Sequence, residues 1–444
     1  MTAMPNAAMT APLHQSSEGR WPRICERRAR PNETRVAMVS FHTSPLAELG
    51  RSRDAGGMNV YIRELAQHLG RRGTTVDIFT RWTDPNLPQI IPLSTGARLI
   101  HIPAGPIAPI HKNDLFQYTS AFAAGIDCFA VSNRCDYHVI HSHYWLSGVA
   151  GLELAQRWGA PHLTMFHTLA RLKQVARPAE VESPLRIAQE GRIIQQSNMV
   201  IVATEDERDQ IARLYAAAQN NLQTIPCGVD LGRFTPEHRA DDSARLRQEL
   251  HLGTAPIILY VGRLDPLKGA ELLVRSLATM QTEATLVLVG GDAQDPERAK
   301  LQTLAAELGI SPRIRFVDAA PHAALPMYYR AADIMAVASH YESFGLVAVE
   351  ALACGTPVIA PRVGGLPTIV QDGFNGALVC HRTPQHFAAR FDALLGQPCQ
   401  LAALRANART SVRHFSWHAI AEQVSALYEA VGTDAHTMEA VALQ

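Results

Sequence analysis

The chain has 444 residues, of which 47% are apolar and 18% are charged, and its 41 basic residues balance 41 acidic ones. This length predicts two or more domains, and the zero net charge argues against a nucleic-acid partner. No apolar run has the length of a transmembrane segment. The seven cysteines are dispersed without a CxxC pair. That pattern is typical of reduced thiols, so we expect a cytoplasmic protein.

Residues 1–33 carry no hydrophobic periodicity and are predicted to form a disordered tail. The arginines within it are not followed by an apolar segment, unlike those of a signal peptide. Beyond the tail, short β-branched runs alternate with helical patterns, which predicts an α/β fold with a parallel sheet and helices on both faces. Strands of a first unit are expected at residues 35–40, 75–80, 98–102, 137–141, 162–166 and 199–203.

The alternation stops near residues 225–230 and restarts after a polar stretch at 235–243, which we interpret as a linker. The pattern therefore predicts two doubly wound domains with a cleft between them. Ligands bind such sheets beyond the carboxyl ends of the strands, so a shared cleft suits a transfer between two substrates. Strands of the second unit are expected at residues 257–262, 285–290, 313–317, 333–338 and 357–360.

Two carboxylates, Glu342 and Glu350, lie eight residues apart around a predicted helix start, for which Ser343 is a plausible N-cap. Glu350 would lie about 12 Å farther along the axis, at ~1.5 Å per residue. That distance is close to the length of a nucleotide-sugar between its ribose and its hexose. A carboxylate at each end can bind hydroxyls while the helix N-terminus faces the diphosphate. The alternative for an isolated pair is two solvated glutamates on an amphipathic helix.

Two loops that follow predicted strands have anion-binding character. Arg263 and Lys268 lie between a strand and a helix start, which is the right place and charge for a diphosphate. A surface Arg and Lys in an ordinary loop is the alternative, and no Walker motif is present. Gly56 and Gly57 open the first helix, where paired glycines let a backbone approach a ligand closely. A plain tight turn is the alternative, and the absence of GxGxxG argues against NAD.

Hydroxyl and imidazole groups gather where two strands of the first unit end, at residues 141–148 and 166–170. Single histidines are more often core residues than catalysts. A phosphate on a small acceptor can be bound by such a group of side chains, although the sequence does not show that its members meet in space. The candidates for this phosphate site are Lys112, Tyr144, Thr168 and Arg186.

From residue 35 to about residue 430 the chain resembles the retaining GT-B glycosyltransferases of family 4. The stretches that carry the resemblance are residues 35–45, 56–61, 141–148, 167–170, 261–264, 342–350 and 362–367. The resemblance implies an N-terminal acceptor domain over residues 34–228 and a nucleotide-sugar domain over residues 229–414, both Rossmann-like. A C-terminal helix at residues 415–432 would cross back and complete the first domain.

The resemblance also implies a role for individual residues. Arg263 and Lys268 would hold the donor diphosphate, Glu350 the ribose and Glu342 a hydroxyl of the transferred sugar, which His167 would also contact. His167, Arg263, Lys268 and Glu342 are therefore the implied catalytic set. Gly56, Gly57, Phe344, Gly345 and Leu346 complete the donor site, and His42, Asp54, Asn59, Lys112, Tyr144, Thr168 and Arg186 form the acceptor site.

No cofactor is expected to be required, because no DxD motif serves the donor phosphates. A magnesium site is implied weakly at Tyr329, Arg330, Ala332 and Thr356. The expected reaction moves a sugar from a donor of the UDP-GlcNAc or UDP-glucose type to a small phosphorylated polyol, with inositol phosphate first. The alternatives are transfer to a sugar phosphate, as in sucrose-phosphate synthases, and nucleotide-sugar 2-epimerisation on the same fold. A homodimer is left open.

Overall fold

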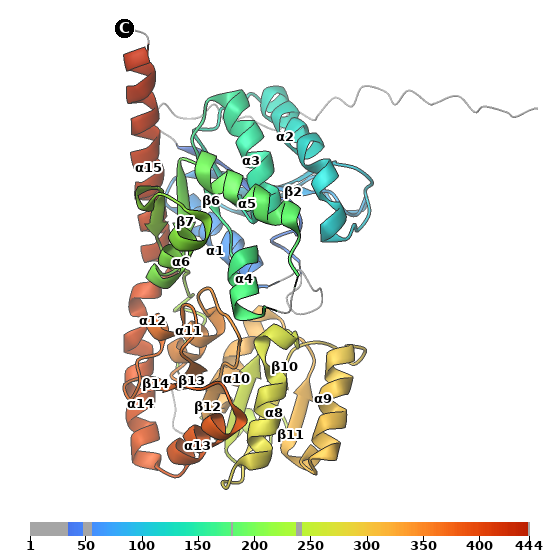
Figure 1. The fold of residues 1–444 in the computed structure, drawn as a ribbon, viewed down its shortest axis with the longest axis vertical. Coiled ribbons are helices and arrows are strands. Elements are labelled where there is room, and N and C mark those ends of the chain that lie inside the picture. The colour runs from blue at the N-terminus through green and yellow to red at the C-terminus, as the bar shows by residue number, and fades with distance from the viewer. Residues whose placement is uncertain (1–33, 48–55, 179–180, 237–241, 443–444) are drawn as a thin grey trace, which may run out of the picture.

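The computed structural model describes residues 34–47, 56–178, 181–236 and 242–442, so the predicted tail lies outside the described residues. Two α/β domains lie one above the other in Figure 1, and the long helix α15 (Trp417–Ala442) runs beside the upper one. Each domain has its own sheet with helices on both faces. The predicted pair of doubly wound domains is thus confirmed.

The first domain contains an eight-stranded sheet in the order β3-β4-β2-β1-β5-β6-β7-β8. Its central strands are buried along their whole length, as expected for a sheet covered on both sides. All neighbours are parallel except the edge pair β3 and β4, which is antiparallel. The strands are β1 (Arg35–Ser40), β2 (Thr75–Arg81), β3 (Ile90–Ser94), β4 (Ala97–Ile102), β5 (Val139–His143), β6 (His162–Met165), β7 (Met199–Val202) and β8 (Leu222–Thr224). Its helices are α1 (Gly57–Arg71), α2 (Thr119–Asn133), α3 (Trp145–Trp158), α4 (Ala170–Ala176), α5 (Pro184–Gln196) and α6 (Glu205–Tyr215).

The second domain contains a six-stranded parallel sheet in the order β11-β10-β9-β12-β13-β14. The strands are β9 (Ile257–Val261), β10 (Thr285–Val289), β11 (Ile314–Val317), β12 (Ile334–Ala336), β13 (Val358–Pro361) and β14 (Gly376–Val379). The helices are α7 (Asp242–Glu249), α8 (Ala270–Thr279), α9 (Pro296–Glu307), α10 (Leu325–Ala331), α11 (Leu346–Ala353), α12 (Leu366–Ile369), α13 (Pro384–Leu395) and α14 (Pro398–Ser411).

Every predicted strand is present, with ends shifted by a few residues, and the predicted strands of the first sheet all pair in parallel, as expected. Strand β3 runs antiparallel at the edge, and its Pro92 fits there because an edge strand need not donate on both sides. Three strands, β3, β8 and β14, have no counterpart in the prediction. They are short and lack a clear alternating pattern, so the sequence signal for them was weak.

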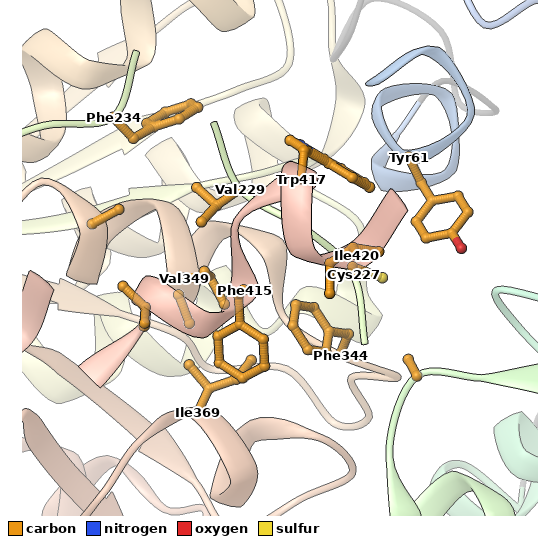
Figure 2. Packing of buried hydrophobic residues seen from close by; sticks show 14 of the residues in the cluster. Tyr61, Cys227, Val229, Phe234, Phe344, Val349, Ile369, Phe415, Trp417 and Ile420 are labelled. Atoms are coloured by element: carbon orange, nitrogen blue, oxygen red, sulfur yellow. The ribbon is translucent and has the colours of Figure 1, made fainter. Parts of the chain in front are cut away.

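The chain passes between the domains twice, and the two passages lie side by side. The N–H of Val229 donates to the carbonyl of Phe415 at 2.7 Å, and the N–H of Trp417 donates back to Val229 at 3.3 Å. Trp417 then packs edge-on against Tyr61 of α1, with ring centroids 5.5 Å apart (Figure 2). Farther along α15, the hydroxyl of Tyr428 is 2.7 Å from Nδ1 of His141 in β5. The last helix therefore leaves the second domain and packs on the first.

Trp417→Ala should destabilise the protein by about 3–5 kcal/mol, because it leaves a cavity beneath α15 where the two passages meet. The measurement is the free energy of unfolding from urea denaturation. His418→Ala is the matched control, since His418 is the next residue and is exposed. Equal stabilities of the two variants would show that the packing of Trp417 does not stabilise the protein.

Candidate active site

A cavity of about 380 Å³ lies between the two domains, at the carboxyl ends of strands from both sheets. Most of the residues predicted for the site line it: His42, Gly56, Gly57, Lys112, Tyr144, His167, Thr168, Arg263, Lys268, Glu342, Phe344, Gly345 and Leu346. Asn59, Arg186 and Glu350 are buried outside this lining. Asp54 lies outside the described residues.

The loop after β9 presents two cations to the cavity. Asp265 caps the 3-10 turn Pro266–Lys268 by accepting from the N–H of Leu267 at 2.8 Å. Gly269 follows with φ of 75°, and a Cβ there would lie 2.1 Å from the carbonyl of Ala338, so the turn requires glycine. This geometry places Nζ of Lys268 2.7 Å from a carboxylate oxygen of Glu342, while Arg263 lies 3.6 Å from Asp265.

The backbone of Glu342 is held by the two glycines that follow β13. The N–H of Gly365 donates to the carbonyl of Glu342 at 2.8 Å. Gly364, with φ of 50°, approaches so closely that a Cβ would lie 2.0 Å from the same oxygen. The hydroxyl of Ser339 donates to the Glu342 carboxylate at 3.1 Å. These contacts with Ser339, Gly364 and Gly365 hold Glu342 at the carboxyl edge of the second sheet.

Ser343 is not the N-cap of the helix that follows, which corrects the sequence-based expectation. The N-cap of α11 is Gly345, with φ of 112° and no side-chain cap. Ser343 instead donates from its hydroxyl to the carbonyl of His167, at 2.9 Å, and so joins the two domains. Because no side chain caps α11, its first N–H groups are available to an anion in the cavity, which Leu346 and Val347 line.

Glu350 is buried one turn inside α11, where only 4% of its surface is exposed. Its carboxylate accepts from the hydroxyl of Tyr329 at 2.8 Å and lies 2.7 Å from Nε2 of His322. The two glutamates thus have different surroundings: Glu342 faces the cavity beside a lysine, and Glu350 lies in a hydrogen-bonded site behind it. Its contact with a ribose stays a prediction.

On the side of the first domain, Tyr144 organises the predicted acceptor residues. His42 packs on its ring with centroids 4.3 Å apart, and the guanidinium of Arg186 lies 5.1 Å above the ring. Arg186 also donates to the carbonyl of Thr168 at 2.9 Å. Its other bonds go to Glu182 and Glu190, at 3.0 and 2.7 Å. Tyr144, Thr168 and Arg186 therefore meet, and Lys112 lines the same cavity, but Arg186 is bound to two carboxylates.

The side chain of Asn59 forms local hydrogen bonds within the first domain. Its amide donates to the hydroxyl of Thr43 at 3.1 Å and to the carbonyl of Ser44 at 2.6 Å, and its oxygen accepts from the N–H of Gly56. These bonds tie the loop after β1 to the start of α1. They hold Gly57 beside Leu346 of the second domain, where a Cβ would lie 3.1 Å from the leucine side chain.

His167 lines the cavity, is half-buried and has an unusual backbone conformation. Its φ is 59°, and its Nε2 is 3.1 Å from Nδ1 of His143. Burial lowers the pKa of His167 to about 3, and lowers the pKa of His143 well below its usual value. Both imidazoles are therefore neutral near pH 7, which suits hydrogen bonding to a sugar better than general-base catalysis.

The residues of the weakly implied magnesium site do not fit a cation in their present arrangement. The carbonyl of Tyr329 accepts from the hydroxyl of Thr356 at 2.6 Å, and the carbonyl of Ala332 accepts from Arg405 at 2.9 Å. A metal bound to Ala332 would have to displace a guanidinium, which carries its own positive charge. Nor does the described part of the chain contain a group of three or more His, Cys, Asp or Glu residues that can hold a metal ion.

Sequence reasoning missed several residues that line the cavity, among them the charged residues Lys173 and Glu207. Lys173 lines the wall and lies 3.3 Å from Glu182, next to the predicted acceptor residues. Glu207, in the first turn of α6, accepts from the N–H of Ala203 at 2.8 Å, and burial raises its pKa to about 7. The pattern Thr-x-x-Glu at residues 204–207 does indicate a helix start. It carries no signal that the carboxylate faces a cleft formed with another domain.

Glu207→Gln should make stability less dependent on pH. The unfolded carboxyl has a pKa near ~4.3, and the folded one has a pKa of about 7. Stability from this group is therefore fully present below the unfolded value and is lost as the pH rises through the folded value. Because the amide oxygen of glutamine can still accept from Ala203, the variant should gain free energy of unfolding over wild type between pH 5 and pH 8. Glu205→Gln, exposed on the same turn, should show no such gain, and a pH-independent difference for Glu207→Gln would contradict the assignment.

Comparisons with known proteins identify the family and the fold. The model described as "Glycosyltransferase Family 4" matches residues 55–233, and the one described as "Glycosyl transferases group 1" matches residues 242–411. A D-inositol 3-phosphate glycosyltransferase of Xylanimonas cellulosilytica is 42% identical, over 89% of this chain and 96% of the relative. The corresponding protein of Jonesia denitrificans is 40% identical, with the same coverage of both chains.

Among solved structures, sucrose-phosphate synthase from Thermosynechococcus elongatus superposes with a TM-score of 0.83 and 36% identity, over 90% of this chain and all of that one. Anabaena HepE in complex with UDP and glucose, at 19% identity and a TM-score of 0.72, shares the fold. No helix of the described residues is long and apolar enough to cross a membrane. The chain belongs to the family 4 glycosyltransferases and has their two-domain GT-B architecture.

Proposed function

We propose that this enzyme is a retaining glycosyltransferase that moves a sugar from a UDP-sugar to inositol phosphate. The observation that carries the proposal is the position of Lys268 and Glu342, 2.7 Å apart at the uncapped start of α11, across one cavity from Lys112, Tyr144 and Thr168. The first group suits a sugar diphosphate, and the second suits a phosphorylated acceptor. The names of the full-length relatives support inositol phosphate as that acceptor.

In the proposed mechanism, Arg263, Lys268 and the N–H groups of α11 stabilise the negative charge that develops on the departing diphosphate. Glu342 binds a hydroxyl of the transferred sugar once Lys268 turns to the phosphate. The acceptor hydroxyl attacks from the face that the diphosphate leaves, and its proton passes to a departing phosphate oxygen. No protein nucleophile takes part, and neutral His167 orients the sugar.

We further propose that transfer requires no metal, because two cations already face the place of the diphosphate and the Ala332 carbonyl is bound by Arg405. Magnesium would then change the rate little. A cytoplasmic location remains our proposal as well, since no disulfide joins the six described cysteines.

The function is tested by incubating the purified chain with UDP-GlcNAc or UDP-glucose and one acceptor, with product masses read by mass spectrometry and their stereochemistry by NMR. The acceptors are inositol phosphate, inositol, fructose 6-phosphate and none, each with Mg²⁺ and with EDTA. We expect transfer to inositol phosphate and a product with retained anomeric configuration. Preferred transfer to fructose 6-phosphate would establish the sucrose-phosphate synthase alternative. A change in the donor sugar without any acceptor would establish the epimerase.

Lys268→Ala should lower kcat/KM by about a hundredfold, which corresponds to roughly 3 kcal/mol of lost charge-assisted stabilisation in the transition state. The measurement is steady-state kinetics with saturating acceptor. Lys300→Ala is the control, because Lys300 on α9 pairs with Glu297 outside this cavity. A Lys268→Ala enzyme with near-wild-type kcat/KM would show that the donor site has been misplaced.

Lys112→Ala should raise the acceptor KM about tenfold or more and leave the donor KM unchanged, because one charge-assisted contact to the phosphate is lost. We choose Lys112 over Arg186, whose removal would strand buried Glu190 without its cation. Asn113→Ala is the control on the same exposed turn. An unchanged acceptor KM, or an equal increase in KM for unphosphorylated inositol, would show that Lys112 does not bind the acceptor phosphate.

A further inference from the structure

A line of buried side chains runs from the cavity through the first domain to the last helix. Strand β5 places His141 and His143 on one face, since residues two apart in a strand point the same way. The rings of His141 and His143 are 4.3 Å apart, and those of His143 and His167 are 5.3 Å apart. Nδ1 of His141 lies 2.7 Å from the hydroxyl of Tyr428 in α15. His141 and His143 are buried, and His167 is half-buried where it lines the cavity.

The contact between His143 and His167 joins two ring nitrogens, Nδ1 of the first and Nε2 of the second, at 3.1 Å. Burial keeps both rings neutral near pH 7. A neutral pair can place only one proton in this bond, so one ring must donate and the other must accept. Because Nε2 of His167 is taken, its Nδ1 is the nitrogen left for a ligand in the cavity. The direction of the inner bond therefore decides whether His167 offers the ligand a donor or an acceptor.

The surroundings of the other nitrogen of His143 favour one direction. Among the described residues, Nε2 of His143 is buried without a hydrogen-bond partner, and so is the hydroxyl of Tyr61. The two rings lie edge to face with centroids 5.7 Å apart. A buried N–H without an acceptor is rarer in proteins than an incompletely satisfied acceptor. The proton of His143 is therefore more stable on Nδ1, where it takes part in the hydrogen bond to His167, than on Nε2, which has no acceptor.

We propose that His143 is a positioning residue that holds His167 in its Nδ1–H tautomer, so that His167 donates a hydrogen bond to a substrate oxygen in the cavity. The inference rests on the proposed function only for the identity of that oxygen. His141 packs on His143 and is itself held by Tyr428, so α15 supports the line from its far end. The left-handed backbone of His167 and the bond from Ser343 to its carbonyl fix the same residue from the other side.

The tautomer is measured first, by NMR of the full chain with ¹⁵N-labelled histidine and no substrate. The His167 signals are assigned by their loss in a His167→Gln variant. We expect a protonated, pyrrole-type Nδ1 and an unprotonated, pyridine-type Nε2 in wild type, and loss of this single pattern in His143→Ala. A protonated Nε2 of His167 in the wild-type protein would overturn the proposal. This result does not depend on which donor and acceptor the enzyme uses.

Kinetics then separate positioning from simple packing. His143→Ala should lower kcat about tenfold, the effect of one lost neutral hydrogen bond, with both KM values nearly unchanged. His143→Asn keeps an N–H near the position of Nδ1 and should recover most of the loss. The matched control is His162→Ala, because His162 is buried one strand away and bonds Ser142 and Ser197, at 2.7 and 3.1 Å. The control should lose thermal stability without losing kcat per folded molecule.

These kinetics use whichever donor and acceptor give transfer in the panel described above. The test of His143 therefore does not depend on whether inositol phosphate is the acceptor. Equal kcat for His143→Ala and wild type would overturn the role. So would equal losses of kcat in His143→Ala and His162→Ala, or no recovery in His143→Asn.

Discussion

The arrangement of this enzyme depends on the packing of Trp417 where the chain crosses between its domains. The indole lies so close to Gly228 that a Cβ there would be 2.4 Å from it, and it contacts Tyr61 of the first domain. Two residues earlier, Phe415 packs edge-on against Phe344 at 5.4 Å, as Figure 2 shows. Phe344 is two residues from Glu342, so this apolar packing at the domain crossing also supports the loop that carries the Glu342 carboxylate.

One continuous core links these parts, because the cluster of buried residues around Trp417 includes side chains from α1, both domain crossings, β9, β13 and α11. Close-packed side chains transmit displacements, since they cannot be compressed. A shift of one domain against the other must therefore repack this cluster or rotate about it. The bond from Ser343 to the carbonyl of His167 crosses the same boundary on the cavity side. Together these contacts set the width of the cavity.

The two walls of the cavity differ in how they handle charge. The wall from the second domain carries Arg263, Lys268 and Glu342, whose charged side chains are partly exposed to solvent. On the side of the first domain, burial keeps His143 and His167 neutral, and behind the wall the Arg186 guanidinium lies between two carboxylates. Partly solvated charges suit a departing diphosphate, and neutral imidazoles beside the Lys112 cation suit sugar hydroxyls and a phosphate. The division matches the proposed donor and acceptor sides.

The sequence by itself determined the alternation of strands and helices, the two-domain organisation and the family. These depend on local apolar periodicity and on short motifs such as the one from Glu342 to Glu350, which are read within a few residues. Most of the residues that the sequence predicted for the site do line the cavity. Some were found because loops after parallel strands gather at one edge of each sheet, and others through the resemblance to the family.

Only the tertiary structure decided which partners the side chains have. The hydroxyl of Ser343 binds the carbonyl of His167, which lies in the other domain, and a glycine replaces it as helix cap. Glu350 is buried against His322 and Tyr329, while Glu207 turns toward the cavity. These outcomes depend on how two sheets and one crossing helix are placed in space. No local pattern records that placement, because the contacts join residues far apart in the chain.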